Sequence, residues 1–283
     1  MKNHINANQI KIAYQLDGPE NGPVVMMSNS LMSSLEMWDS NIHALTDRYR
    51  VIRYDTRGHG QTQVTEGPYS IALLAHDLVS LMDALHIPSA HLVGLSMGGM
   101  ICQYIGANYP DRALSLSLCD TASEMPPRSL WEERFAIART QGIAGLVDGT
   151  IKRWFLSEFI QREPQQIEHV KHMILGTPVD GYLACASAVR DMAQSTMLLK
   201  IKAPTMVLVG KQDPACTVDQ ATVLHRLIPH SSMVVLDQAA HLARRHQQYV
   251  EHSFPRLRTS RAVAPLLRHD ESETQLARHR VAL

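Results

Sequence analysis

The chain has 283 residues, of which 45% are hydrophobic and 19% are charged, and this composition is typical of a globular protein with a sizeable core. Its 27 basic residues balance its 27 acidic residues, so the charge does not favour a nucleic-acid partner or an anionic membrane. No apolar run approaches the length of a membrane span, and we expect no N-terminal signal segment.

The four cysteines are far apart and do not have the spacing of metal ligands. Two of them lie in predicted core elements, which favours free buried thiols over disulfides. We therefore expect a cytoplasmic protein that needs neither a metal ion nor a cofactor. The four are Cys102, Cys119, Cys185 and Cys216.

Short apolar runs alternate with helical stretches along most of the chain. Ser70 is in the N-cap position of a predicted helix whose apolar face begins at Leu74. This alternation predicts an α/β fold, with a mostly parallel central sheet that carries helices on both faces. The predicted strands are residues 10–14, 24–27, 50–54, 91–95, 114–119, 205–210 and 233–236.

Residues 125–200 interrupt this alternation, because they have helical patterning and few β-branched runs. An all-helical insertion between two strands predicts a helical cap over the C-terminal edge of the sheet. We therefore divide the chain into a core of residues 1–124 and 201–242 and a cap of residues 125–200.

A serine stands between the strand at 91–95 and the helix that follows it, in the motif Gly94-Leu95-Ser96-Met97-Gly98. The flanking glycines allow a sharp turn, which exposes the hydroxyl at a helix N-terminus. There the free N–H groups and the helix dipole favour a developing negative charge. Ser96 is therefore a candidate nucleophile.

Two further polar residues follow later strands, and ligands of open α/β sheets bind beyond the carboxyl ends of strands. Asp213 follows the strand at 205–210, with Asp219 as a nearby alternative, and His241 follows the strand at 233–236. The chain order Ser96, Asp213, His241 is that of an α/β-hydrolase triad. His241 is then the candidate base, and Asp213 is the acid that orients it.

An oxyanion needs two N–H donors. We expect one at Met97, directly after the serine, and the other at Leu31, in the loop after the strand at 24–27. Asp55 and His59 also follow a strand, but we expect them to build a loop in which Arg57 pairs with Asp55.

Together these motifs resemble the α/β-hydrolase superfamily and, within it, the 3-oxoadipate enol-lactonases. The resemblance runs from near the N-terminus to Leu242. The motifs that carry it are Ser28-Asn29-Ser30-Leu31, Tyr54-Asp55-Thr56-Arg57-Gly58-His59-Gly60, Gly94-Leu95-Ser96-Met97-Gly98-Gly99-Met100, Trp131-Glu132-Glu133-Arg134, Arg153-Trp154-Phe155, Thr177-Pro178-Val179-Asp180-Gly181-Tyr182 and Arg190-Asp191-Met192.

This resemblance implies a serine hydrolase that opens the enol-lactone of 3-oxoadipate in the breakdown of aromatic acids. Such a lactone carries a carboxylate, so its pocket needs a cation, and arginine suits a carboxylate best. We expect Arg134 and Arg190 in this role, with Arg153 as a third candidate, and Trp131 and Trp154 as cap contacts to the substrate. The family typically has glycine where this chain has Met32, which would narrow the pocket.

Two other functions are compatible with the sequence. One is a general carboxylesterase or perhydrolase with the same triad and an apolar cap pocket. The other is a non-catalytic binding protein on the hydrolase fold, against which the three triad residues argue. In each case we expect a small-molecule ligand, and the oligomeric state stays open.

Residues 243–283 differ in character from the rest of the chain. They contain no lysine, and their eight arginines face only four acidic residues. The family has an amphipathic helix at this point, but Pro255 interrupts the apolar stripe here. We interpret this segment as a frame-shifted or foreign C-terminus, with a natural basic extension as the alternative.

Overall fold

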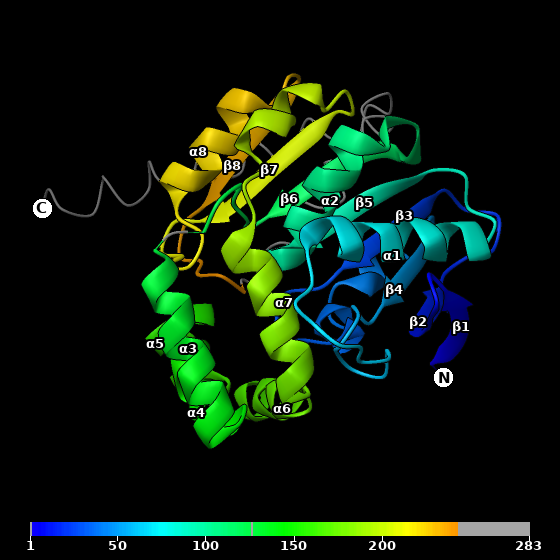
Figure 1. The fold of residues 1–283 in the computed structure, drawn as a ribbon. Helices are drawn as coiled ribbons and strands as arrows, with labels where there is room; N and C mark the ends of the chain where they lie inside the picture. The colour runs from blue at the N-terminus through cyan, green and yellow to red at the C-terminus, as the bar shows by residue number, and fades with distance from the viewer. Residues whose placement is uncertain (1, 126, 243–283) are drawn as a thin grey trace, which may run out of the picture. The chain divides into compact units, whose positions relative to one another are not determined.

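The computed structural model describes residues 2–125 and 127–242, and its centre is an eight-stranded sheet (Figure 1). The strand order is β1-β2-β4-β3-β5-β6-β7-β8. β1 and β2 join by antiparallel pairing, and every pair from β4 to β8 is parallel. The strands are β1 (Asn3–Ala7), β2 (Ile10–Asp17), β3 (Val24–Ser28), β4 (Arg50–Tyr54), β5 (Ala90–Leu95), β6 (Ala113–Cys119), β7 (Thr205–Gly210) and β8 (Ser231–Leu236).

Three helices, α1 (Ile71–Ala84), α2 (Met97–Asn108) and α8 (Val218–Leu227), share one apolar core with the sheet. The side chain of Ser70 accepts a hydrogen bond from Leu73 N–H and so caps α1, as the sequence predicts. The short 3₁₀ helices are η1 (Leu35–Trp38), η2 (Ile42–Ala44), η3 (Pro110–Arg112) and η4 (Ser195–Lys200).

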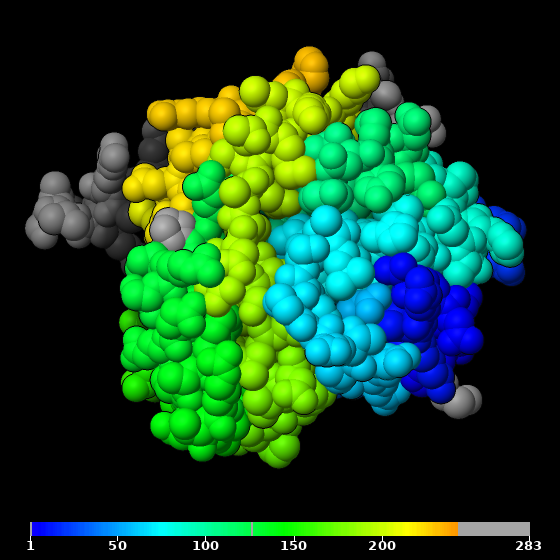
Figure 2. Space-filling model, viewed as in Figure 1, coloured from blue at the N-terminus to red at the C-terminus, as the bar shows by residue number. Residues whose placement is uncertain are grey.

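Five helices lie between β6 and β7 in the sequence and gather at one end of the sheet (Figure 1). In the space-filling view they form a continuous green to yellow-green lobe (Figure 2). This helical segment is anchored to the core by a hydrogen bond from Tyr69 N–H to the carbonyl of Ala184 (3.2 Å). The helices are α3 (Arg128–Gln141), α4 (Ala144–Trp154), α5 (Ser157–Arg162), α6 (Pro164–Leu175) and α7 (Val179–Asp191).

All seven predicted strands are present, with ends that shift by up to three residues. β1 and α8 were not among the predicted elements, although Thr217 and Gln220 form a capping box, which is a sequence signal for the start of α8. All four cysteines are free and buried. No helix of residues 2–125 and 127–242 is long and apolar enough to span a membrane. The proposed foreign segment, 243–283, lies outside the described residues.

Candidate active site

Ser96 lies on the turn between β5 and α2 with φ at 55°, a value that is uncommon for residues other than glycine. The two glycines of the motif are required by close packing. A Cβ at Gly94 would lie 2.2 Å from the carbonyl oxygen of Gly98, and one at Gly98 would lie 2.0 Å from that of Ser28. Ser96 N–H donates to the carbonyl of Cys119 (2.9 Å), which fixes the turn against β6.

Asp213 and His241 are both buried and form a hydrogen-bonded pair, with 2.8 Å between Nδ1 of His241 and Oδ2 of Asp213. The other carboxylate oxygen accepts the N–H groups of Ala215 (2.7 Å) and Cys216 (3.1 Å). An ionised carboxylate in this position keeps the proton on Nδ1, so Nε2 is left as an acceptor. The alternative acid, Asp219, is exposed in the first turn of α8.

The thiol of Cys216 lies beside this pair, and one ligand atom each from Asp213, Cys216 and His241 lie within 4.8 Å of one another. Within the described part of the chain, this is the one group of three such side chains that lie close enough to share a metal ion, but a thiol that keeps its proton is a poor metal ligand. Burial raises the pKa of the Cys216 thiol well above its usual value, although a hydrogen bond with Ser96 acts in the opposite direction. The Ser96 hydroxyl is therefore hydrogen-bonded to a neutral thiol that lies beside His241 and Asp213.

Burial by itself would lower the pKa of His241, but the charge and hydrogen bond of Asp213 outweigh it, and the pKa is raised. The charge of Asp120 adds to this effect. Asp120 directly follows β6, and its Oδ1 accepts the N–H of Gly210 (2.8 Å) at the start of the loop that carries Asp213. Asp120 was not among the predicted site residues, although its position directly after a predicted strand is the same signal that indicated Asp213.

The two expected oxyanion donors lie on the turn that carries Ser96 and in the loop after β3. Met97 is the first residue of α2, where N–H groups have no partner within the helix. Neither its N–H nor that of Leu31 donates to an acceptor among residues 2–125 and 127–242. Since the carbonyl of Ser28 packs against Gly98, the loop that contains Leu31 begins directly beside the turn that carries Ser96.

A neutral histidine holds this loop. Met32 has φ at 64°, and its N–H donates to Nε2 of His59 (3.0 Å). Burial lowers the pKa of His59 to about 4, against a smaller opposing effect of the Arg57 carbonyl. His59 is therefore uncharged at neutral pH and accepts the Met32 N–H.

The expected Arg57–Asp55 pair does not form. Arg57 instead makes a two-bond ion pair with Asp77 in α1, at 2.6 and 2.8 Å. Asp55 accepts the backbone N–H groups of Leu35 (2.7 Å) and Gln61 (2.8 Å). The expectation was wrong because it paired neighbours in sequence, whereas the fold brings α1 to Arg57 and η1 to Asp55.

Two arginines of the cap helices lie together. Arg134 in α3 donates through Nε to the hydroxyl of Tyr182 (3.1 Å), and its guanidinium lies 5.1 Å from the ring centre of Trp131. Arg153 in α4 donates to the hydroxyl of Thr150 (3.2 Å). Burial lowers the pKa of Arg153 to about 10, and the positive charge of Arg134 adds to this effect.

Neither of these two side chains pairs with a carboxylate in the described parts of the chain, and both are half-buried. Both arginines lie near the candidate catalytic residues. Arg134 and Thr150 both contact the sulfur of Met32, at 3.6 and 3.8 Å. Met32 lies in the loop of residues 29–34, which we call the oxyanion loop after its expected role. The charge of Arg153 acts to lower the pKa of His241.

Arg190, by contrast, is held by two carboxylates. It forms ion pairs with Glu132 (2.7 Å) and Asp191 (2.6 Å), so its charge is already balanced. The geometry therefore favours Arg134 and Arg153 over Arg190 as the cations that a bound anion would meet.

The two tryptophans expected to contact substrate are both buried, with exposed fractions of 4% for Trp131 and 5% for Trp154. Trp131 donates through its indole N–H to the carbonyl of Met125 (3.1 Å) and stacks under Arg134. The ring of Trp154 lies 6.4 Å from that of His241.

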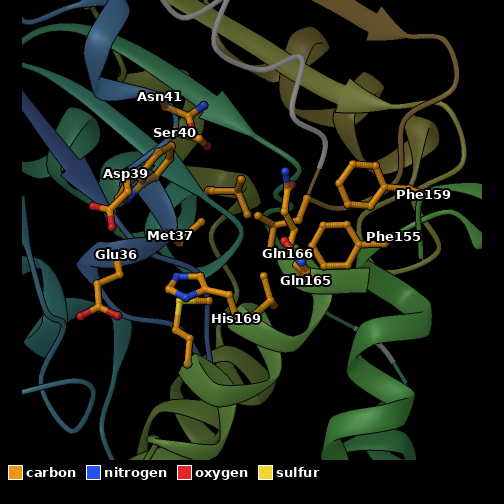
Figure 3. A pocket seen from close by; sticks show the side chains of 15 residues that line it. Glu36, Met37, Asp39, Ser40, Asn41, Phe155, Phe159, Gln165, Gln166 and His169 are labelled. Carbon is orange, nitrogen blue, oxygen red and sulfur yellow. The ribbon is translucent and has the colours of Figure 1, made fainter. Parts of the chain in front are cut away.

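A groove of about 340 Å³ lies between α5, α6 and the segment around η1. Leu95 and Leu242, the neighbours of Ser96 and His241, form part of its wall. Figure 3 shows Phe155 and Phe159 on one side and the segment from Glu36 to Asn41 on the other. The groove is a largely apolar surface beside the candidate catalytic residues.

Comparison with known proteins agrees with this geometry. A family model described as the alpha/beta hydrolase fold matches residues 23–243. The chain is 34% identical over 242 residues to 3-oxoadipate enol-lactonase 2 of Acinetobacter baylyi, which covers 86% of this chain and 90% of the relative. This chain is an α/β hydrolase of the enol-lactonase family.

Solved structures extend the likeness to the whole described fold of this hydrolase. The enol-lactonase from Burkholderia xenovorans has a TM-score of 0.86 at 33% identity, covering 88% of this chain and 97% of that one. A thermophilic esterase from Thermogutta terrifontis, solved with malate bound, has a TM-score of 0.83 at 28% identity, with coverage of 91% and 98%. The predicted α/β architecture and the predicted family are therefore confirmed.

Proposed function

We propose that this hydrolase opens a small enol-lactone with a free carboxylate, the enol-lactone of 3-oxoadipate, in the catabolism of aromatic acids. Two of its relatives, both from Acinetobacter baylyi, are named for this lactone. The observation that carries the proposal is the half-buried pair Arg134 and Arg153, which has no carboxylate partner among the described residues and lies against the oxyanion loop.

In the proposed mechanism, Ser96 Oγ attacks the lactone carbonyl while Nε2 of His241 takes the hydroxyl proton. The negative oxygen accepts the N–H groups of Leu31 and Met97. Ring opening breaks the bond between the carbonyl carbon and the ring oxygen, His241 returns its proton to the leaving enolate, and the enol rearranges to the ketone. Water, deprotonated by His241, then attacks the acyl-enzyme, which releases 3-oxoadipate and restores Ser96.

The arginine pair supplies what a neutral-ester pocket lacks. Two guanidinium groups close enough to lower the pKa of one of them repel each other, and a bound carboxylate relieves that repulsion. The planar guanidinium also matches a carboxylate in geometry. A bound lactone carboxylate is thereby held on the cap side, with its carbonyl free to reach Ser96.

The test compares an anionic lactone with a neutral ester. We expect wild type to hydrolyse the lactone, and Ser96→Ala to serve as the blank. Arg134→Ala and Arg153→Ala should each lower kcat/KM for the lactone by about 10- to 100-fold, with a much smaller effect on p-nitrophenyl acetate. Arg139→Ala, a cap arginine on the same helix as Arg134, is the control, and Arg190→Ala should behave like it. Equal losses on both substrates would overturn the assignment.

A general carboxylesterase is the second candidate function. The apolar groove beside Leu95 and Leu242 favours it, because it offers more apolar surface than a small anionic lactone needs. The similar Thermogutta terrifontis structure is described as an esterase. A higher kcat/KM for p-nitrophenyl butyrate than for the lactone would favour this function.

We also propose that the reaction takes place in the cytoplasm. The support is the state of the cysteines, which are all free and buried, as is usual in a reducing compartment. Fractionation of the native cells with an antibody to this chain would test the placement.

A further inference from the structure

Trp154 joins the cap to the segment that carries His241. It is the last residue of α4, and its indole ring lies 6.4 Å from the imidazole of His241, with 33° between the ring planes. Its carbonyl accepts the backbone N–H of Leu242 (3.0 Å), the residue directly after the histidine. Trp154 therefore contacts the histidine segment through both its side chain and its backbone.

Among the described residues, the loop after β7 also contacts this segment. Asp213 accepts a hydrogen bond from Nδ1 of His241. Gln212 makes two hydrogen bonds to the turn before His241: its N–H donates to the carbonyl of Ala239 (2.9 Å), and its side-chain oxygen accepts the N–H of Ala239 (3.0 Å). One hydrogen bond at Nδ1 does not by itself fix the tilt of the imidazole about that bond. The Trp154 ring is the aromatic neighbour of the imidazole among the described residues.

We propose that Trp154 is a positioning residue for His241, so that the cap as well as the sheet places the base. The ring restricts the imidazole to the orientation in which Nε2 meets Ser96, and it also excludes water from a residue that is only 2% exposed. This role differs from the substrate contact that the sequence suggested for Trp154.

The same turn of α4 carries Arg153, directly before Trp154 in the chain. One helix end therefore brings an anion-binding side chain and the support of the base to the active site together. The proposal rests on His241 acting as the base of the proposed function. It does not depend on the identity of the lactone, because a contact that orients His241 affects the reaction of Ser96 with every substrate.

The experiment uses Trp154→Leu and Trp154→Phe in the full chain, with Phe135→Leu as the matched control. Phe135 is a cap aromatic in α3 that is as fully buried as Trp154. The readouts are the rate at which a small neutral fluorophosphonate labels Ser96, and kcat and KM for p-nitrophenyl acetate.

We expect Trp154→Leu to lower the labelling rate and kcat by about 10- to 100-fold with little change in KM, because misplacement of a reacting group by about 1 Å has an effect of this size. Trp154→Phe should restore most of the rate, and Phe135→Leu should leave the labelling rate within about twofold of wild type. A rate for Trp154→Leu equal to that of Phe135→Leu, at matched folding by circular dichroism, would overturn the proposal.

The two proposals fail in different ways. If the wild-type chain neither reacts with the fluorophosphonate nor hydrolyses the lactone, the proposed function is wrong. If wild type reacts and the Trp154→Leu variant reacts equally fast, only the positioning role is wrong. The ratio of lactone to acetate turnover should stay unchanged in Trp154→Leu, whereas it should fall in Arg153→Ala.

Discussion

The N–H of Met32 donates to Nε2 of His59 over 3.0 Å, and this bond helps to join the oxyanion loop to the loop after β4. Met32 has a positive φ, which disfavours side chains other than glycine by about 1 to 2 kcal/mol. The histidine bond helps to hold that backbone in place, and with it the adjacent N–H of Leu31. His59 is thus a support of the candidate oxyanion hole and takes no chemical step in the proposed mechanism.

We predict that acid weakens the fold through His59. Its pKa in the folded chain is about 4, below its ordinary value of 6.5, so the unfolded state binds more protons between these two values. The free energy of unfolding should therefore fall as the pH drops from about 6.5 to about 4, by up to roughly 3 kcal/mol from this group.

Urea unfolding at pH 7 and pH 5 measures this effect. His59→Gln should make the stability less dependent on pH over that interval, and it should lower kcat on lactone and ester alike because the oxyanion loop loosens. An unchanged pH dependence in the variant would show that other groups carry the acid sensitivity.

We predict that Met32 limits the space for the substrate. Its side chain is 1% exposed and contacts both Arg134 and Thr150. Met32→Gly should relieve the positive φ yet lose buried packing, for a net destabilisation of about 1 to 3 kcal/mol. The opened space should raise kcat/KM for p-nitrophenyl butyrate relative to acetate, and Met32→Leu should not. An unchanged ratio in Met32→Gly would contradict this.

Much of the sheet and of the candidate triad was predictable from the sequence, because the ends of strands and the glycines at turns are local signals. The positions of Ser96, Asp213 and His241 after three strands are enough to bring them to one edge of a parallel sheet. The partners of arginines were not predictable in the same way. Arg57 pairs with Asp77, twenty residues away, and only the fold shows that Arg134 and Arg153 lie together while Arg190 is neutralised.

Two carboxylates should set the pH dependence of the reaction. Since the pKa of His241 is raised, kcat/KM should fall with decreasing pH through a value above 6.5, as the base becomes protonated. Asp213→Asn removes the stronger of the two effects that raise the pKa of His241, and it no longer holds the imidazole in the Nδ1–H tautomer. This change should lower kcat by about 10⁴-fold. This loss is measured against the Ser96→Ala blank.

Asp120→Asn gives a finer test. The amide oxygen can still accept the Gly210 N–H, so the loop is kept while the charge is removed. The acid limb of the pH profile should then move to lower pH with a small change in the plateau rate. A limb that stays in place would show that Asp120 acts on the loop and not on the imidazole.

The Arg57–Asp77 pair predicts a large loss of stability from a residue outside the proposed mechanism. Both side chains are less than one-tenth exposed, and Asp77 also accepts a hydrogen bond from Asn8 (2.6 Å). Asp77→Ala leaves a buried guanidinium without its counter-charge and should lower the free energy of unfolding by about 3 to 5 kcal/mol. The control is Asp83→Ala, which removes the exposed partner of Arg112 and should change stability by less than about 1 kcal/mol. Equal effects of the two variants in urea unfolding would mean that burial does not govern the strength of these pairs.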